Sequence, residues 1–219
     1  MEIILERIPA TFQLAFMAFA FSVLLGVPLG ILSAVKRGSV MDIIGKTIAL
    51  IGQSAPVFWL GIMLMFFFAV KLEWLPPYGR DNLTAVILPA VTLGWFYAAA
   101  NMRLLRSAML DVLDSEFVKL ARAKGVSKNG VIWKHSLRNA LIPVLTFAGV
   151  TLGNLVTGSL VVETVFAWPG LGQLAIKALF ANDYPLLQAV IMVFTLMYVT
   201  AALLVDLMYA YIDPRIRYS

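Results

Sequence analysis

Five long stretches without a charged side chain divide this sequence, and they limit what it can fold into. They cover Ile8–Val35, Thr47–Val70, Asn82–Met102, Asn139–Val162 and Tyr184–Val205, which are 28, 24, 21, 24 and 22 residues long. A helix needs about 20 apolar residues to cross the roughly 30 Å hydrocarbon core of a bilayer. Because backbone polar groups in lipid must be bonded internally, we predict five transmembrane helices in an all-α, polytopic membrane helix bundle.

The composition supports a membrane protein and excludes several other classes. The chain is 61% hydrophobic and only 13% charged, and its mean hydropathy is +0.90, which is too apolar for a soluble domain of this size. It has no cysteine, so disulfides and thiol chemistry are excluded. The net charge of +5 requires no nucleic-acid partner, because the excess lies where membrane topology would place it. We therefore expect contact with membrane lipid and no nucleic-acid partner.

The distribution of lysine and arginine predicts how these helices are oriented. The chain has 17 such residues. Of these, 13 lie in the loop that directly follows the first charge-free run, in the loop that directly follows the third, or in the C-terminal tail, and the other four lie elsewhere. Cytoplasmic loops carry an excess of Lys and Arg. We therefore place a loop of about residues 109–140 in the cytoplasm and a segment of about residues 163–183 outside. We expect residues 1–219 to form a single transmembrane domain with an external N-terminus.

The polar stretch Asp111–Pro143 carries the local signals of a helix, a glycine and a second helix. Asp114 or Ser115 can cap the first helix, and Gly125 can end it in a conformation with positive φ. Ser127 can cap a second helix. These signals predict an ordered cytoplasmic element rather than an extended connection.

One face of the first predicted helix is apolar. Phe117, Leu120 and Ala121 follow the i, i+3, i+4 spacing that places side chains on one side of a helix. An exposed apolar patch rimmed by charge is typical of a docking site. The alternative is a solvated basic loop without a partner.

At these residues the sequence resembles the permease subunits of bacterial ABC importers, and within them the dipeptide, oligopeptide and nickel branch. The general signature is Glu-Ala-Ala, three residues, Gly, nine residues, Ile-x-Leu-Pro. The form Ala-Arg-Ala-Lys-Gly at 121–125, the run 134–143, Pro169-Gly170-Leu171-Gly172 and the tail Asp213–Tyr218 resemble this branch. Ala121, Gly125 and Leu137 match the general signature, whereas Lys119, Leu120, His135 and Arg138 replace its Glu, first Ala, Ile and Pro.

The resemblance implies a membrane-spanning subunit of an ATP-driven importer in a bacterial-type inner membrane, and not an enzyme. Such a subunit forms half of the translocation pathway for peptides, nickel or a related small solute. The implied partners are cytoplasmic ABC ATPase subunits, a second, related permease subunit and an extracytoplasmic substrate-binding protein. The 111–143 loop is implied to dock on the ATPase through Phe117, Lys119, Leu120, Ala121, Arg122, Ala123, Lys124 and Gly125.

The start of the chain departs from the branch that it resembles. Members of this branch begin with an additional helix and an external segment, and the family's first helix has no counterpart here. We therefore expect Met1 to be an internal, truncated or misassigned start.

Polar residues within the apolar runs are the candidates for lining a translocation pathway. Pro56 predicts a kink whose polar neighbours face a cavity, with simple helix packing as the alternative. Glu163 is expected to be an interfacial carboxylate with ready access to water rather than a substrate contact. The candidate pathway residues are Gln53, Ser54, Asn154, Thr157, Ser159 and Glu163.

The sequence carries no motif for catalysis or for a cofactor. His135 is the single histidine and has no cysteine partner, so a metal site is not expected. Gly45-Lys46-Thr47 is not a phosphate-binding loop, because Val40 stands where the first glycine would be. The alternative functions are a stand-alone secondary carrier and an intramembrane enzyme. An ion-coupled carrier would place ionisable groups at mid-membrane, and the charge-free runs have none there.

Overall fold

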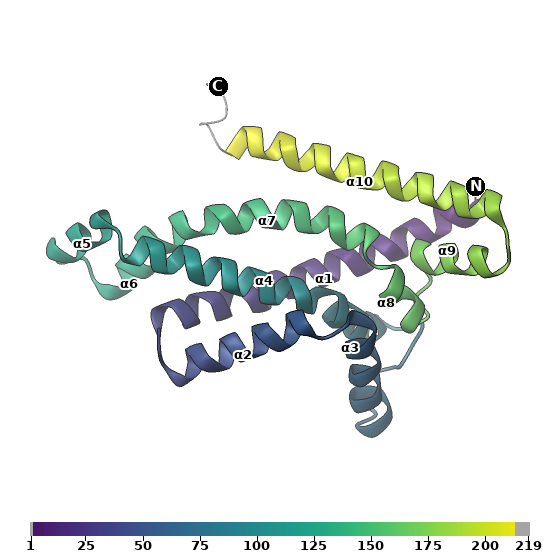
Figure 1. Ribbon diagram of the computed structural model, residues 1–219, viewed down its shortest axis with the longest axis horizontal. Coiled ribbons are helices and arrows are strands. Elements are labelled where there is room, and N and C mark those ends of the chain that lie inside the picture. The colour runs from purple at the N-terminus through teal and green to yellow at the C-terminus, as the bar shows by residue number, and fades with distance from the viewer. Residues whose placement is uncertain (1, 213–219) are drawn as a thin grey trace. The chain divides into compact units, whose positions relative to one another are not determined.

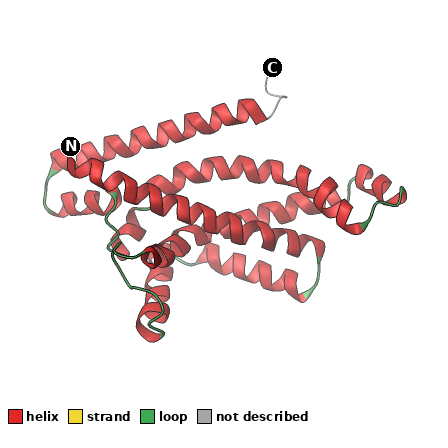
Figure 2. Cartoon of the chain, turned by 180° about the vertical axis from the view of Figure 1, so that it is seen from behind, coloured by secondary structure: helices red, strands yellow, loops and turns green. Residues whose placement is uncertain are grey.

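The computed structural model describes residues 2–212, and every regular element in this range is helical (Figures 1 and 2). The predicted branch-like tail Asp213–Tyr218 lies outside the described residues. The α-helices are α1 (Glu2–Val35), α2 (Val40–Ser54), α3 (Val57–Leu64), α4 (Ile87–Leu113), α5 (Glu116–Ala123), α6 (Lys128–Gly130), α7 (Leu137–Thr157), α8 (Leu160–Val165), α9 (Leu171–Phe180) and α10 (Tyr184–Ile212). Shorter stretches with other helical geometry are η1 (Met65–Lys71), η2 (Leu83–Val86) and η3 (Val131–Ser136).

Long apolar helices confirm the predicted all-α membrane class. Four helical stretches of the described chain are long and apolar enough to span a bilayer, and a bent pair makes a fifth if it is counted as one span. The four stretches are Glu2–Val35, Leu83–Leu113, Lys128–Thr157 and Tyr184–Leu204, and the bent pair is Val40–Ser54 with Val57–Lys71.

The break in the bent pair falls at Pro56, as the sequence predicts. Proline has no amide hydrogen to donate and disfavours helical geometry in the residue before it. Pro56 lies between the end of α2 and the start of α3 as the N-cap residue of α3, and its own backbone is not helical (φ −59°, ψ 135°).

Several helices differ in extent from the charge-free runs that predicted them, as α4 and α7 illustrate. α4 continues past the end of its run at Met102 as far as Leu113, because Leu105 and Met109 keep one side of it fully buried. The fourth run is interrupted, since α7 ends at Thr157 and α8 begins only at Leu160. Charge alone therefore marks the apolar segments without marking where their helices end.

The helices form two compact units, one of which contains residues 22–54 and 95–148. Its core joins buried side chains of α1, α4, η3 and α7. Gly26 and Gly30 allow the helices to approach closely, because a Cβ at these positions would lie 2.6 Å from the Ala98 carbonyl oxygen and 2.9 Å from that of Met102. Small residues bring transmembrane helices together in this way.

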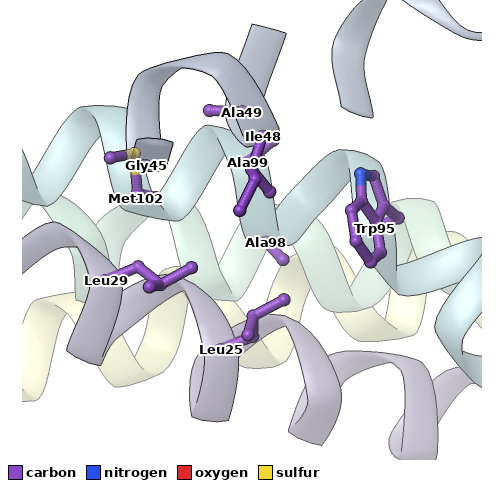
Figure 3. A pocket seen from close by; sticks show the side chains of 9 residues that line it. All are labelled: Leu25, Leu29, Gly45, Ile48, Ala49, Trp95, Ala98, Ala99 and Met102. Carbon is purple, nitrogen blue, oxygen red and sulfur yellow. The ribbon is translucent and has the colours of Figure 1, made fainter. Parts of the chain in front are cut away.

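In the same unit, α2 packs tightly against α4 (Figure 3). Gly45 and Gly52 face Met102 and Trp95, and a Cβ at either glycine would collide with the opposing side chain. The space enclosed here, about 10 Å³, is at the lower limit for one water molecule. This contact is therefore packed core rather than a binding cavity.

The other unit contains residues 2–21, 55–94 and 149–212 of the described chain. α9 packs against both α8 and α10 in this unit. One cluster of its core consists of Ile4, Leu171, Leu174, Ala175 and Val190. The turn after α8 is buried as well, with Phe166 and Trp168 almost completely excluded from solvent.

Candidate functional site

The predicted docking loop contains an ordered helix, α5, whose ends lie where the sequence places them. Ser115 is the N-cap residue by backbone conformation (φ −70°, ψ 153°), although its hydroxyl donates to the Val112 carbonyl instead of accepting from the helix. Glu116 in the first turn is favourably placed for the helix dipole. The helix therefore begins at the predicted residue, but the side-chain capping bond expected there is not formed.

Gly125 ends α5 in a Schellman motif. Its φ is +80°, its amide donates to the Arg122 carbonyl at 3.0 Å, and the Val126 amide donates to the Ala121 carbonyl at 3.1 Å. This pair of bonds satisfies carbonyls at the helix end and requires a left-handed residue, for which glycine has no steric penalty. The prediction that Gly125 ends the helix with a positive φ is confirmed.

The second part of the loop also follows the prediction. The Ser127 hydroxyl accepts a bond from the Gly130 amide at 3.3 Å and caps α6. η3 follows directly, and Val131 and Ile132 on it are buried. α5 contacts η3, so the loop is a small packed element rather than an extended, unpacked segment.

α5 has one anchored face and one exposed apolar face. Val118 is completely buried, whereas the side chains of Phe117 and Leu120 remain 46% and 56% exposed. Ala121 is half-buried at the edge of the exposed face. The helical spacing predicts the exposed face but does not predict that Val118 is buried. Val118 is the residue that fixes the helix to the chain.

Charged side chains surround this exposed apolar face. Lys119 and Glu116 form an exposed ion pair at 2.8 Å, and Arg122 and Lys124 are exposed. A groove of about 380 Å³ lies next to the helix and is lined in part by Arg122 and Lys128. Ala123 and Gly125 are exposed too, so most of the eight predicted docking residues lie on accessible surface. Their docking role remains a prediction.

The same unit contains a buried ion pair that the sequence does not predict. Asp42, at the start of α2, is fully buried and accepts bonds from Arg106 Nε at 2.8 Å and Nη2 at 3.1 Å. The Ser33 hydroxyl also donates to Asp42, and the Lys46 ammonium lies 2.9 Å from it. The group joins α1, α2 and α4. The spacing of Asp42 and Lys46 is the only local signal, because Arg106 lies far along the chain.

The six candidate pathway residues fall into different environments. Ser54 is exposed and donates to the Leu50 carbonyl at 2.9 Å, while Thr157 lies 3.3 Å from the Gly153 carbonyl oxygen and is half-buried. Gln53 and Asn154 are half-buried, and Ser159 is fully buried. Gln53 and Ser54 belong to one unit and the remaining four residues to the other. A shared pathway lining therefore remains a prediction.

The expectation that Glu163 has ready access to water is wrong. Its side chain is fully buried, and both carboxylate oxygens accept hydrogen bonds from the surrounding protein. Glu163 follows directly after the charge-free run, which is why it is expected at the edge of a span, but the turn that follows α8 folds back and covers it.

Among the residues that the structure describes, no group of three or more metal-ligating side chains occurs.

Sequence comparison identifies relatives along the whole chain. Residues 26–218 match the family model described as binding-protein-dependent transport system inner membrane component. The chain is 47% identical over 218 residues to a glutathione transport system permease protein of Pectobacterium atrosepticum, covering 100% of this chain and 71% of that protein. It is 40% identical over 246 residues to a dipeptide transport system permease protein of Alkalihalophilus pseudofirmus, covering 100% of this chain and 74% of that protein.

Solved structures of ABC transporters share the fold. The MetNI methionine ABC transporter in an inward-facing conformation matches with a TM-score of 0.80 and 21% identity over 97% of both chains. An amino acid ABC transporter with histidines matches with a TM-score of 0.77 and 14% identity, over 96% of this chain and 94% of that one. The family match over most of the chain, with close relatives and this shared fold, confirms the resemblance to ABC importer permeases: the chain belongs to the family of binding-protein-dependent transport system inner membrane components.

Proposed function

We propose that this chain is the membrane-spanning subunit of an ATP-driven importer that carries small peptides, and that it forms half of the translocation pathway. The observation that carries the substrate class is its 47% and 40% identity, across the whole chain, to permeases named for glutathione and for a dipeptide. Both are short peptides with amide bonds and free carboxylates. The peptide is delivered by an extracytoplasmic binding protein.

The energy for transport comes from cytoplasmic ATPase subunits that bind α5. Phe117 and Leu120 support this proposal, because they are large, exposed and carried on a helix that Val118 anchors to the chain. An amphipathic helix that presents its apolar side to a groove is a recurrent mode of protein recognition. A second, related permease subunit completes the pathway.

A stand-alone ion-coupled carrier is the less favoured alternative. Such carriers place ionisable groups near the middle of the membrane to bind the coupling ion. Among the side chains that the structure describes, the two fully buried carboxylates are those of Asp42 and Glu163, and both are engaged by several donors of the protein. These contacts support a structural use of the buried charge.

The substrate class is tested by competition. Cells that express the chain with the ATPase, permease and binding protein that co-purify with it are given a labelled dipeptide. We expect unlabelled dipeptide, or a tripeptide such as glutathione, to suppress uptake, while a nickel salt leaves it unchanged. Suppression by nickel alone would contradict the peptide assignment and favour the metal-importing members of the branch.

A further inference from the structure

The carboxylate of Glu163 is the meeting point of three helices in its unit. Its Oε1 accepts a bond from the Thr11 hydroxyl at 2.8 Å and lies 2.9 Å from the Ser159 hydroxyl. Its Oε2 accepts bonds from the amides of Gly172 at 2.7 Å and Gln173 at 3.1 Å. Because these four donors come from α1, from the residue before α8 and from α9, one side chain connects segments that are distant in sequence.

These contacts satisfy the free amides at the start of α9. The first turn of a helix leaves its amides without partners inside the helix. Gly172 and Gln173 donate to Glu163, and Leu171 donates to the Thr11 hydroxyl at 2.8 Å. A carboxylate at a helix N-terminus is favoured by the helix dipole. The N-terminus of α9 is thus capped by residues of two other helices.

The glycines of the Pro-Gly-Leu-Gly segment make room for this carboxylate. A Cβ on Gly170 would collide with the Glu163 carboxylate. A Cβ on Gly172 would lie 2.5 Å from Leu160 Cα and 3.0 Å from Glu163 Oε2. The φ of Gly170 is −101°, which other residues adopt readily, so space rather than backbone conformation requires glycine there. The two glycines of the motif are therefore explained by the space that Glu163 and Leu160 occupy.

The turn between α8 and α9 is held in place from several sides. Ala167 has a φ of +48°, an unfavourable conformation that persists when the surroundings over-determine it. The Trp168 indole donates to the Ala10 carbonyl at 2.8 Å, and the Trp168 amide donates to the Glu163 carbonyl at 2.8 Å. The adjacent residues Ala10 and Thr11 of α1 thus hold both this turn and the start of α9.

We infer that Glu163 is a positioning residue of the transport cycle, which fixes α9 and residues 166–170 to α1 and α8. A buried carboxylate is costly unless it is fully bonded, and this one is enclosed by protein rather than lining a cavity. It therefore positions helices and does not contact substrate. When α1 moves, the predicted external segment then moves with it. If the hydrogen bonds of Glu163 are lost, α1 and the external segment move independently. The transport readout of this inference rests on the proposed function, whereas its structural readout does not.

Cysteine accessibility in the purified complex provides the structural readout. The chain has no cysteine, so a single cysteine at Ala178, which is 2% exposed on α9, reports whether this helix stays in place. We expect Glu163→Gln to increase labelling of this cysteine by a hydrophilic maleimide about tenfold, because an amide retains one acceptor and presents hydrogens to the amides of α9. A cysteine at Phe180, which is 81% exposed, is the matched control and should label equally in both backgrounds.

Transport by the same variants provides the functional readout. Per assembled complex, we expect Glu163→Gln to lower peptide uptake about tenfold and to raise the ATP hydrolysed per peptide imported, which reduced folding alone would not do. Gly170→Ala should also lower uptake and raise the ATP hydrolysed per peptide. The double variant Glu163→Asp/Gly170→Ala should recover uptake, because the shorter acid leaves space for the methyl group. Thr11→Val, which removes the hydroxyl and keeps the shape, replaces Glu163→Gln if that variant does not assemble.

The outcomes separate this inference from the proposed function. Unchanged labelling of the Ala178 cysteine in both Glu163→Gln and Thr11→Val would overturn the positioning role, whatever the substrate is. Increased labelling with uptake and ATP consumption unchanged would overturn its part in transport. Failure of the wild-type complex to import peptides would contradict the proposed function alone, because the labelling result does not depend on substrate.

Discussion

Replacing Leu120 by aspartate is expected to prevent the chain from recruiting its ATPase while leaving its own fold intact. Leu120 is 56% exposed on α5, and the helix is held by the buried Val118 and the Gly125 cap instead. A charge placed in the apolar centre of an interface removes a contact of about 2 kcal/mol or more. This corresponds to about a 30-fold loss of affinity or greater. Uptake should fall with it.

Lys119→Ala is the matched control for this variant. Lys119 adjoins Leu120 in sequence but pairs with Glu116 in an exposed ion pair, which contributes little to stability. Co-purification of the ATPase and uptake of labelled peptide are measured for both variants at equal amounts of membrane-inserted chain. If Leu120→Asp bound the ATPase and transported as the wild type does, the docking surface would have to lie elsewhere.

Replacing Asp42 by alanine is expected to destabilise the chain more than any surface change near the docking loop. The guanidinium of Arg106 would lose both of its bonds to the carboxylate, and Ser33 would lose its acceptor. Removing one member of a buried pair leaves the other charge uncompensated. We expect a cost of about 2–3 kcal/mol, below the range for a fully enclosed pair, because 19% of the Arg106 side chain and half of that of Lys46 remain exposed.

Asp114→Ala provides the comparison for Asp42→Ala. Its partner Arg37 lies 3.9 Å away, and both side chains are largely exposed, so little stability should be lost. Thermal denaturation of the purified protein, followed by tryptophan fluorescence, measures the difference. An Asp42→Ala variant that melts together with the wild type would show that the network contributes no net stability.

Features that depend on neighbouring residues can be predicted from the sequence. The start of α5 after Ser115, the turn at Gly125 and the break at Pro56 are each local to one residue and its immediate neighbours. The exposed face of Phe117 and Leu120 follows from helical spacing alone. Together these local features are sufficient to place the candidate docking surface on α5.

Features that depend on distant residues cannot be predicted in this way. Thr11 and Glu163 are 152 positions apart, and Asp42 and Arg106 are 64 apart. A single sequence carries no signal that such residues meet. The same limit explains why the sequence position of Glu163 predicts access to water. Its side chain is buried by a turn that folds back over it, and not by the residues beside it in the sequence.

Reconstitution tests most directly whether this chain transports only when a separate ATPase drives it. The chain and its partner permease are placed in proteoliposomes with the binding protein and a labelled dipeptide, with and without the ATPase. We predict uptake only when the ATPase and hydrolysable ATP are both present, and none with a non-hydrolysable analogue. Uptake driven by an ion gradient in the absence of the ATPase would contradict an ATP-driven importer.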